Sequence, residues 1–189
     1  MFYNFCKFIL KIVFNVIYKL EVHGDTKLPN KPLIICANHI SIWDPVVLAI
    51  IFDRKINFMG KKELFKNRII AYLFKKAGVF PVDRENVNIK TIKYSINLLK
   101  NNEVLGIFPE GTRVKNVSED NMKTGVAMIA SRANCDVIPV YIKSDYKCGS
   151  KIDVFIRNKV VIQDFEDFPK ENRNKAITKA IYNDIYQVN

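Results

Sequence analysis

Several features that mark common protein classes are missing from this sequence. Its cysteines, Cys6, Cys36, Cys135 and Cys148, show no C-x-x-C spacing, so we expect reduced, mostly buried thiols in a cytosolic redox setting and no zinc site. There is no glycine-rich nucleotide loop and no G-x-S-x-G turn that would expose a serine nucleophile. These absences argue against a zinc protein, a nucleotide-binding protein built on such a loop, and a serine hydrolase.

Acidic residues are also scarce. Against 30 lysines and arginines there are only 19 aspartates and glutamates, a net charge of +11 in 189 residues. This excess implies attraction to something anionic, namely nucleic acid, a phospholipid surface or a phosphorylated substrate. With 49% hydrophobic and 26% charged residues, the composition is that of one folded domain large enough to bury a core. The phenylalanines are patterned as core or membrane contacts, which disfavours nucleic acid.

A long uncharged apolar run is absent as well. Near the N-terminus the longest stretch without a charge is residues 12–18, whereas a spanning helix needs about 20 apolar residues. Polar residues recur there at spacings of three and four: Asn4, Lys7, Lys11, Asn15 and Lys19. We therefore predict that residues 1–20 form an amphipathic, membrane-anchoring helix whose lysines reach anionic headgroups. The alternative is a helix buried against the domain. No signal-peptide pattern is present.

The rest of the chain alternates between strand-like and helical stretches. Short apolar runs predict strands at residues 33–37, 55–60, 78–84, 103–108 and 136–142, and helices at 89–99, 123–133 and 171–187. Pro139 suggests an edge position or a bulge for its strand, and residues 152–162 suggest a closing hairpin. The basic and apolar stretch 54–76 fits a second membrane contact, an acyl-chain site or a solvated helix face. The pattern predicts one α/β domain over residues 21–189, with a mixed, mostly parallel sheet flanked by helices.

One of the two histidines stands where a strand gives way to a helix. His39 follows the buried run 33–37, and Asp44-Pro45 looks like a helix start with the carboxylate as N-cap. Ligands of α/β folds bind at the carboxyl ends of strands, and a histidine near a carboxylate is a minimal general-base pair. The alternative is a structural histidine beside a helix cap. His23 lies in a polar connector and is expected to be a surface residue.

The turn at residues 109–113 carries a guanidinium, a hydroxyl and free backbone N–H groups. Such a turn is suited to holding a phosphate, although a plain turn with a surface arginine has the same composition. Ser41 and Cys36 lie close in sequence to His39, but neither is expected to be a nucleophile.

Taken together, these blocks resemble the glycerolipid acyltransferase family, most closely the lysophosphatidic acid acyltransferases. The blocks are Asn38-His39 with Asp44 (N-H-x-x-x-x-D), Gly78, Phe80 and Arg84 (G-x-x-F-x-x-R), residues 108–113 (F-P-E-G-T-R), and the proline strand at 137–140. Lys61 lies in a segment similar to the family's lysine-containing one. The resemblance spans about residues 20–162. Val114 departs from the family, which often has serine there, and this puts substrate preference in doubt.

The resemblance implies a role for each matching residue. His39 would take the proton from the free hydroxyl of a lysophospholipid, and Asp44 would orient it. Similar proteins use acyl-CoA or acyl carrier protein as donor, need no metal, and work at the cytoplasmic face of the membrane. Together with the N-terminal helix and the positive charge, this predicts a peripheral protein on an anionic phospholipid membrane. The substrate-binding residues implied by the family are Asn38, Lys61, Arg84, Glu110, Gly111, Thr112, Arg113 and Pro139, with Pro139 shaping the acyl site.

The chemistry agrees with this expectation. An alcohol is a poor nucleophile and a thioester is already activated, so proton removal, alignment and oxyanion stabilisation suffice without an acyl-enzyme. A histidine base typically contributes about 10²–10⁴-fold in rate. The alternatives are an acyltransferase acting on glycerol 3-phosphate or another lysolipid, and a non-catalytic basic protein that binds lipid surfaces.

Overall fold

The computed structural model describes residues 2–83, 89–113 and 122–186. The first half contains α1 (Phe2–Ile17), β1 (Lys19–His23), β2 (Leu33–Ala37), α2 (Asp44–Ile51), β3 (Ile56–Lys61), η1 (Lys62–Phe65), α3 (Arg68–Lys76) and β4 (Val79–Val82). The second half contains α4 (Ile89–Lys100), β5 (Val104–Ile107), α5 (Gly125–Ala133), β6 (Val137–Lys143), β7 (Lys151–Ile156), η3 (Ile162–Phe165) and α6 (Lys170–Tyr186).

The strands form one seven-stranded sheet in the order β1-β7-β6-β2-β5-β3-β4. Strands β2 to β6 run parallel to their neighbours, whereas β7 is antiparallel to β6 and carries β1 parallel to itself. Every residue of the central strand β2 is buried, as its unbroken apolar run requires of a strand covered on both faces. The predicted α/β domain with a mixed, mostly parallel sheet is confirmed.

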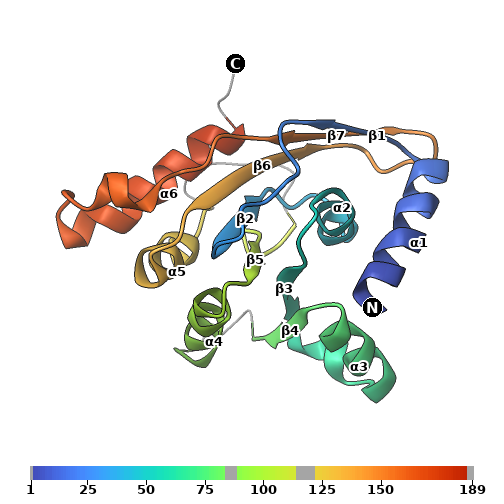
Figure 1. Cartoon of the computed structure of the whole chain (residues 1–189), viewed down its shortest axis with the longest axis horizontal. Coiled ribbons are helices and arrows are strands. Elements are labelled where there is room, and N and C mark those ends of the chain that lie inside the picture. The colour runs from blue at the N-terminus through green and yellow to red at the C-terminus, as the bar shows by residue number, and fades with distance from the viewer. Residues whose placement is uncertain (1, 84–88, 114–121, 187–189) are drawn as a thin grey trace.

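Helices cover both faces of the sheet (Figure 1). On one face, α4, α5 and α6 bury side chains such as Leu99, Ala127 and Ile181 against the sheet. On the other face, α1 and α2 pack through Phe14 and Leu48. The parallel strands are packed between these two hydrophobic cores. Because they run in one direction, their carboxyl ends lie at the same edge of the sheet.

The N-terminal helix packs on the domain through Phe14 and exposes other large apolar side chains on its outward side. One part of the expectation is wrong, because not every lysine of the polar stripe faces outward. Lys7 faces the domain and donates to the backbone carbonyl of Phe52 at the end of α2, and burial lowers the pKa of its ammonium. The helix ends at Ile17, so Lys19 belongs to β1 and not to the polar stripe. Within the described ranges, no helix combines the length and the apolar character needed to cross a membrane.

The edge position expected for the strand of Pro139 and the hairpin expected at residues 152–162 are both wrong. Strand β6 lies inside the sheet, between β7 and β2, and not at its edge. Pro139 is tolerated there because the last pair of the β6–β7 ladder is Val140 with Ile156, so the missing N–H falls where that ladder ends. The stretch 152–162 forms no hairpin, because β7 pairs with β6 and β1 while Val160 makes an isolated bridge to Val137.

Candidate active site

The carboxyl ends of the parallel strands bring most of the predicted site residues to one edge of the sheet. His39 follows β2, the turn 108–113 follows β5, and Lys61 ends β3. Ligands of open parallel sheets bind at this edge. Arg84 and Val114 lie outside the described residues, which exclude 84–88 and 114–121.

His39 and Asp44 form a buried pair. The Asp44 Oδ2 atom lies 2.8 Å from His39 Nδ1, and the side chains are only 8% and 0% exposed. The same oxygen accepts the backbone N–H groups of Ile40 and Ser41, each at 2.7 Å. The loop therefore wraps around the carboxylate, which fixes the imidazole through Nδ1 and leaves Nε2 without a hydrogen-bond partner among the described residues.

The prediction that Asp44 is the N-cap of α2 is wrong. The helix begins at Asp44 as expected, but Trp43 holds the cap position, and the Asp44 carboxylate accepts N–H groups from the residues that precede it. A capping side chain would accept from the residues that follow. The carboxylate is committed to the loop and to His39.

A stack of rings holds the other side of the imidazole. The Phe108 ring lies 4.2 Å from the His39 ring, centroid to centroid, and Phe58 follows at 6.0 Å from Phe108. Gly106 makes room for this stack, because a Cβ atom there would lie 2.3 Å from Cε1 of Phe58. With Asp44 on one side and the stack on the other, His39 is restricted in rotation.

The turn after β5 carries the predicted anion-binding residues. Gly111 adopts a φ of +70°, and a Cβ atom placed on it would lie 3.2 Å from the ammonium nitrogen of Lys123. Thr112 and Arg113 are exposed beyond it. Lys61 is exposed at the end of β3, 3.8 Å from the Glu63 carboxylate. Lys123 adds a cation that the sequence did not single out.

Glu110 is turned toward α6. Its side chain is buried and accepts a hydrogen bond from the hydroxyl of Tyr186, while its Oε2 atom has no partner among the described residues. Burial raises the pKa of this carboxyl, and the Tyr186 hydroxyl and His39 oppose the rise. The Glu110 side chain thus connects the turn after β5 to α6.

Asn38 and Pro139 also lie away from the place expected of substrate ligands. The Asn38 amide is buried and bonds twice to the backbone of Ile142, with Oδ1 accepting at 2.6 Å and Nδ2 donating at 2.8 Å. It joins the end of β2 to β6, a bracing role in place of the predicted substrate contact. Pro139 is buried within β6 in register with Cys36, and it does not line the cavity beside His39.

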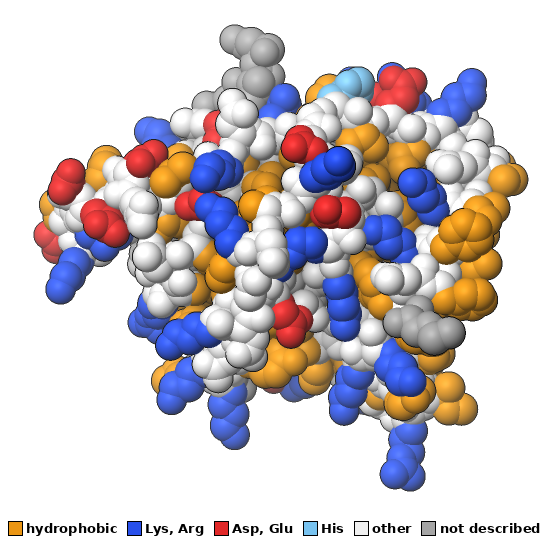
Figure 2. Space-filling model, viewed as in Figure 1, with side chains coloured by type: hydrophobic (Ala, Val, Ile, Leu, Met, Phe, Trp, Pro, Cys, Tyr) orange, Lys and Arg blue, Asp and Glu red, His pale blue; other side chains and the backbone are white. Residues whose placement is uncertain are grey.

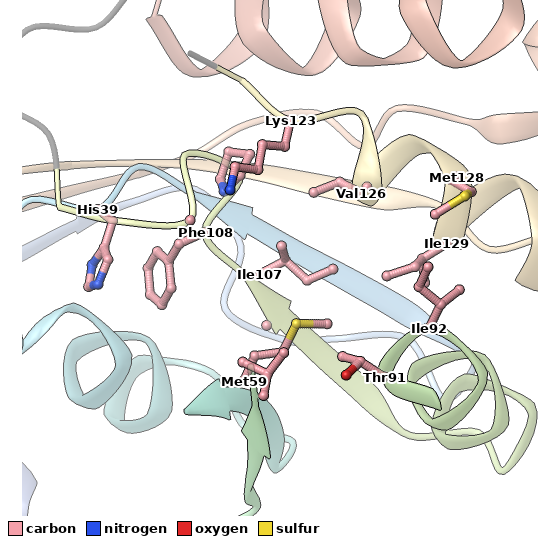
Figure 3. A pocket seen from close by; sticks show the side chains of 15 residues that line it. His39, Met59, Thr91, Ile92, Ile107, Phe108, Lys123, Val126, Met128 and Ile129 are labelled. Atoms are coloured by element: carbon pink, nitrogen blue, oxygen red, sulfur yellow. The ribbon is translucent and has the colours of Figure 1, made fainter. Parts of the chain in front are cut away.

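An apolar cavity of about 140 Å³ opens beside His39 and runs between the sheet, α4 and α5 (Figure 3). His39 and Phe108 stand at one end, and Ile92, Met128 and Ile129 at the other. The only charged side chain among the described residues that line it, apart from His39 if protonated, is Lys123. His39 and the Lys123 ammonium group therefore line the same apolar cavity.

Sequence reasoning missed the residues that reach the site from far along the chain. Tyr146 donates to Asp44 Oδ1 at 2.6 Å, and Tyr186 donates to Glu110. Neither tyrosine belongs to a motif near its partner, since 102 and 76 residues separate the partners. Gly106 could have been noticed as a glycine inside a strand, which often marks a close approach.

Comparison with known proteins agrees with this architecture. The family model described as Acyltransferase matches residues 19–143, which include His39, Asp44 and the turn after β5. The chain belongs to this acyltransferase family.

Individual relatives narrow the similarity. The chain is 35% identical over 188 residues to the 1-acyl-sn-glycerol-3-phosphate acyltransferase of Bacillus subtilis, covering 95% of this chain and 92% of that protein. It is 37% identical over 145 residues to the enzyme of that name from Streptococcus pneumoniae, covering 74% of this chain and 53% of that one. The crystal structure of the 1-acyl-sn-glycerophosphate (LPA) acyltransferase PlsC from Thermotoga maritima superposes with a TM-score of 0.76 at 22% identity, covering 95% and 76% of the two chains.

Proposed function

We propose that the protein transfers a fatty acyl group from an acyl thioester to the free hydroxyl of lysophosphatidic acid, giving phosphatidic acid. The buried contact between His39 Nδ1 and Asp44, beside an apolar cavity, is the observation that carries this function. The name shared by the Bacillus and Streptococcus relatives supports the choice of acceptor. The donor would be a thioester of coenzyme A or of acyl carrier protein.

In this mechanism His39 acts as the base. The lipid hydroxyl gives its proton to Nε2 while its oxygen attacks the thioester carbonyl carbon. The new C–O bond forms, the C–S bond breaks, and the imidazolium returns the proton to the departing thiolate. Asp44 holds the ring in the productive tautomer and stabilises the transient imidazolium, because its carboxylate accepts from Nδ1.

No protein nucleophile is needed in this scheme. Cys36 lies inside β2 with no exposed surface, and burial raises the pKa of its thiol well above the ordinary value. Its thiolate is therefore scarce at neutral pH. The Ser41 hydroxyl accepts from the backbone N–H of Trp43 at 3.3 Å, and the backbone N–H of Ser41 donates to the Asp44 carboxylate.

Substrate groups would be divided between the two parts of the site. Lys123 and Arg113 offer positive charge to the acceptor's phosphate beside the Gly111 turn. The cavity beneath Phe108 offers apolar surface to an acyl chain, lined by side chains such as Met59 and Ile129. The reacting hydroxyl and carbonyl would then meet at His39.

A membrane would supply both lipids. The outward side of α1 exposes large apolar side chains, with Phe5 64%, Phe8 62% and Val16 81% exposed. Figure 2 shows hydrophobic side chains gathered along the edge where α1 lies. Trp43, in the loop that carries His39, is 45% exposed, and its ring packs 5.9 Å from that of Phe14 of α1. We infer peripheral binding to anionic phospholipid at the cytoplasmic face.

The function is tested by following thiol release from acyl-CoA and from acyl carrier protein thioesters, with lysophosphatidic acid, glycerol 3-phosphate, another lysolipid or no acceptor. We expect release that depends on lysophosphatidic acid, with phosphatidic acid as the product seen by mass spectrometry. His39→Gln should lower the rate by about 10²–10⁴-fold. The matched control is His23→Gln, which changes the other histidine, a surface residue 46% exposed on β1. Equal rates in the two variants would contradict the base mechanism, and preference for another acceptor would reassign the substrate.

A further inference from the structure

The loop between β6 and β7 reaches into the candidate active site. Tyr146, in this loop, donates its hydroxyl proton to Asp44 Oδ1 at 2.6 Å. His39, Ile40 and Ser41 all bond to the other oxygen, Oδ2. Among the described residues Tyr146 is thus the donor to the second oxygen of this fully buried carboxylate.

The backbone at Tyr146 is held in a conformation that a bulky residue rarely adopts. Its φ is +54°, in the left-handed region, which is strained for a residue other than glycine. Ser144 holds the turn, since its Oγ atom accepts the Tyr146 N–H at 3.0 Å and donates to the carbonyl of Lys151 at 2.9 Å. Strain of this kind persists where surrounding contacts enforce it, and it is found at functional sites.

The tyrosine hydroxyl keeps its proton in these surroundings. Burial raises the pKa of Tyr146, and the neighbouring Asp44 charge and the hydrogen bond to it raise it further. Tyr146 therefore keeps its proton and remains a donor to Asp44 at neutral pH.

The same loop is tied to the end of α1. The Gly149 N–H donates to the carbonyl of Ile17 at 2.8 Å, and the Tyr18 hydroxyl donates to the carbonyl of Tyr146 at 3.5 Å. The rings of Tyr18 and Tyr146 meet edge to face, 5.9 Å apart. A chain of contacts thus runs from α1 through Tyr18 and Tyr146 to Asp44 and His39.

We propose that Tyr146 is a positioning residue of the His39–Asp44 pair, and that it couples the packing of α1 on the domain to the proton affinity of that pair. Its catalytic consequence rests on the proposed role of His39 as general base. By donating to Oδ1, Tyr146 stabilises the ionised form of the Asp44 carboxylate. Without that donor the pair binds a proton at higher pH, whether the proton settles on the imidazole or on the carboxylate.

Other charged groups also surround the imidazole and must stay constant in a test. Within the described residues these are Asp44 from α2, Glu110 from the turn after β5, and Lys123 from the segment before α5. A tyrosine-to-phenylalanine change at position 146 alters none of them and keeps the ring packing against Tyr18.

The experiment is a histidine titration by NMR on the full chain in detergent micelles, aided by the presence of only two histidines. In Tyr146→Phe we expect the His39 midpoint to rise by about one pH unit or more, with His23 unchanged. The acid limb of kcat/KM should move upward by the same amount. The control is Tyr141→Phe, on the α6 face of β6, where the ring packs against Phe155 and Tyr186; it should move neither quantity. An unchanged His39 midpoint in Tyr146→Phe overturns the proposal.

Two more variants separate the parts of the proposal. Ser144→Ala loosens the turn without altering Tyr146, and it should raise the His39 midpoint by a smaller amount. Tyr18→Leu should do the same if α1 acts through Tyr146, and an unchanged midpoint there refutes the link to α1 alone. A wild-type protein that leaves lysophosphatidic acid unreacted would end the proposed function, while the midpoint would still decide the role of Tyr146.

Discussion

Replacing Asp44 by asparagine keeps the shape of the side chain and removes its charge, so the structure predicts its effect closely. The carboxylate accepts from His39, Ile40 and Ser41 on one oxygen and from Tyr146 on the other. An amide NH₂ must face one of these donor sets. The less costly orientation turns it toward Tyr146, whose hydroxyl can rotate to accept.

The loss of stability follows from those bonds. A hydrogen bond to a charged group contributes about 1.5–3 kcal/mol and a neutral one about 0.5–1.5 kcal/mol, so weakening this set should lower the unfolding free energy by about 2–4 kcal/mol. For a chain of this size that corresponds to a fall in Tm of roughly 4–16 °C. The catalytic loss should be about 10²–10⁴-fold, because the imidazole loses both its orientation and the charge that stabilises its protonated form.

The chain offers its own control, a second histidine–aspartate pair on the surface. His23 Nε2 lies 3.2 Å from Asp153 Oδ1, and this histidine is 46% exposed. Asp153→Asn should change the unfolding free energy by about 0–1 kcal/mol and leave thiol release unchanged. Calorimetry and the thiol-release assay measure both variants. If Asp44→Asn matched Asp153→Asn in Tm and in rate, the buried pair would have neither the structural nor the catalytic role assigned to it.

Three other predictions each concern a single substitution. Gly106→Ala should lower the unfolding free energy by about 1–3 kcal/mol, because its Cβ would lie 2.3 Å from a phenylalanine ring. Gly125→Ala, which meets nothing within 4 Å at the start of α5, should not lower it, and equal urea midpoints in the two variants would contradict this. Burial raises the pKa of Glu110, so the folded state loses stability as pH rises through that pKa; in Glu110→Gln the Tm measured from pH 4 to 8 should fall less than in wild type, and parallel curves would refute the assignment. Val16→Asp should weaken sedimentation with anionic vesicles at least about 10-fold, whereas Phe168→Asp, near α6, should not; similar sedimentation would remove α1 from the membrane contact.

Local patterns in the sequence were enough to predict much of the fold and the pair at its centre. The unbroken apolar run 33–37 becomes the buried strand β2, and the spacing from His39 to Asp44 spans one tight loop whose contacts are local. The turn after β5 was predictable for the same reason, since Pro109 ends the strand and a glycine with φ of +70° follows. Features of this kind depend on neighbours within a few residues.

The remaining features depend on contacts that no local pattern contains. Two faces of α1 were visible in the sequence, but the face that meets the domain depends on distant contacts, namely the packing of Phe14 in the core and the Phe52 carbonyl that accepts from Lys7. The brace of Asn38 on Ile142 spans 104 residues, so the amide looked free for substrate. The interior position of Pro139 follows from where the β6–β7 ladder ends, which is a property of the sheet.

The left-handed backbone at Tyr146 has a consequence for how the protein responds to selection. Glycine or asparagine would adopt that φ at lower cost, but either residue would leave the buried Asp44 Oδ1 without the hydroxyl that donates to it. A library screened only for heat resistance should therefore keep tyrosine at position 146, because that hydrogen bond and the ring packing against Tyr18 together outweigh the strain that glycine would relieve.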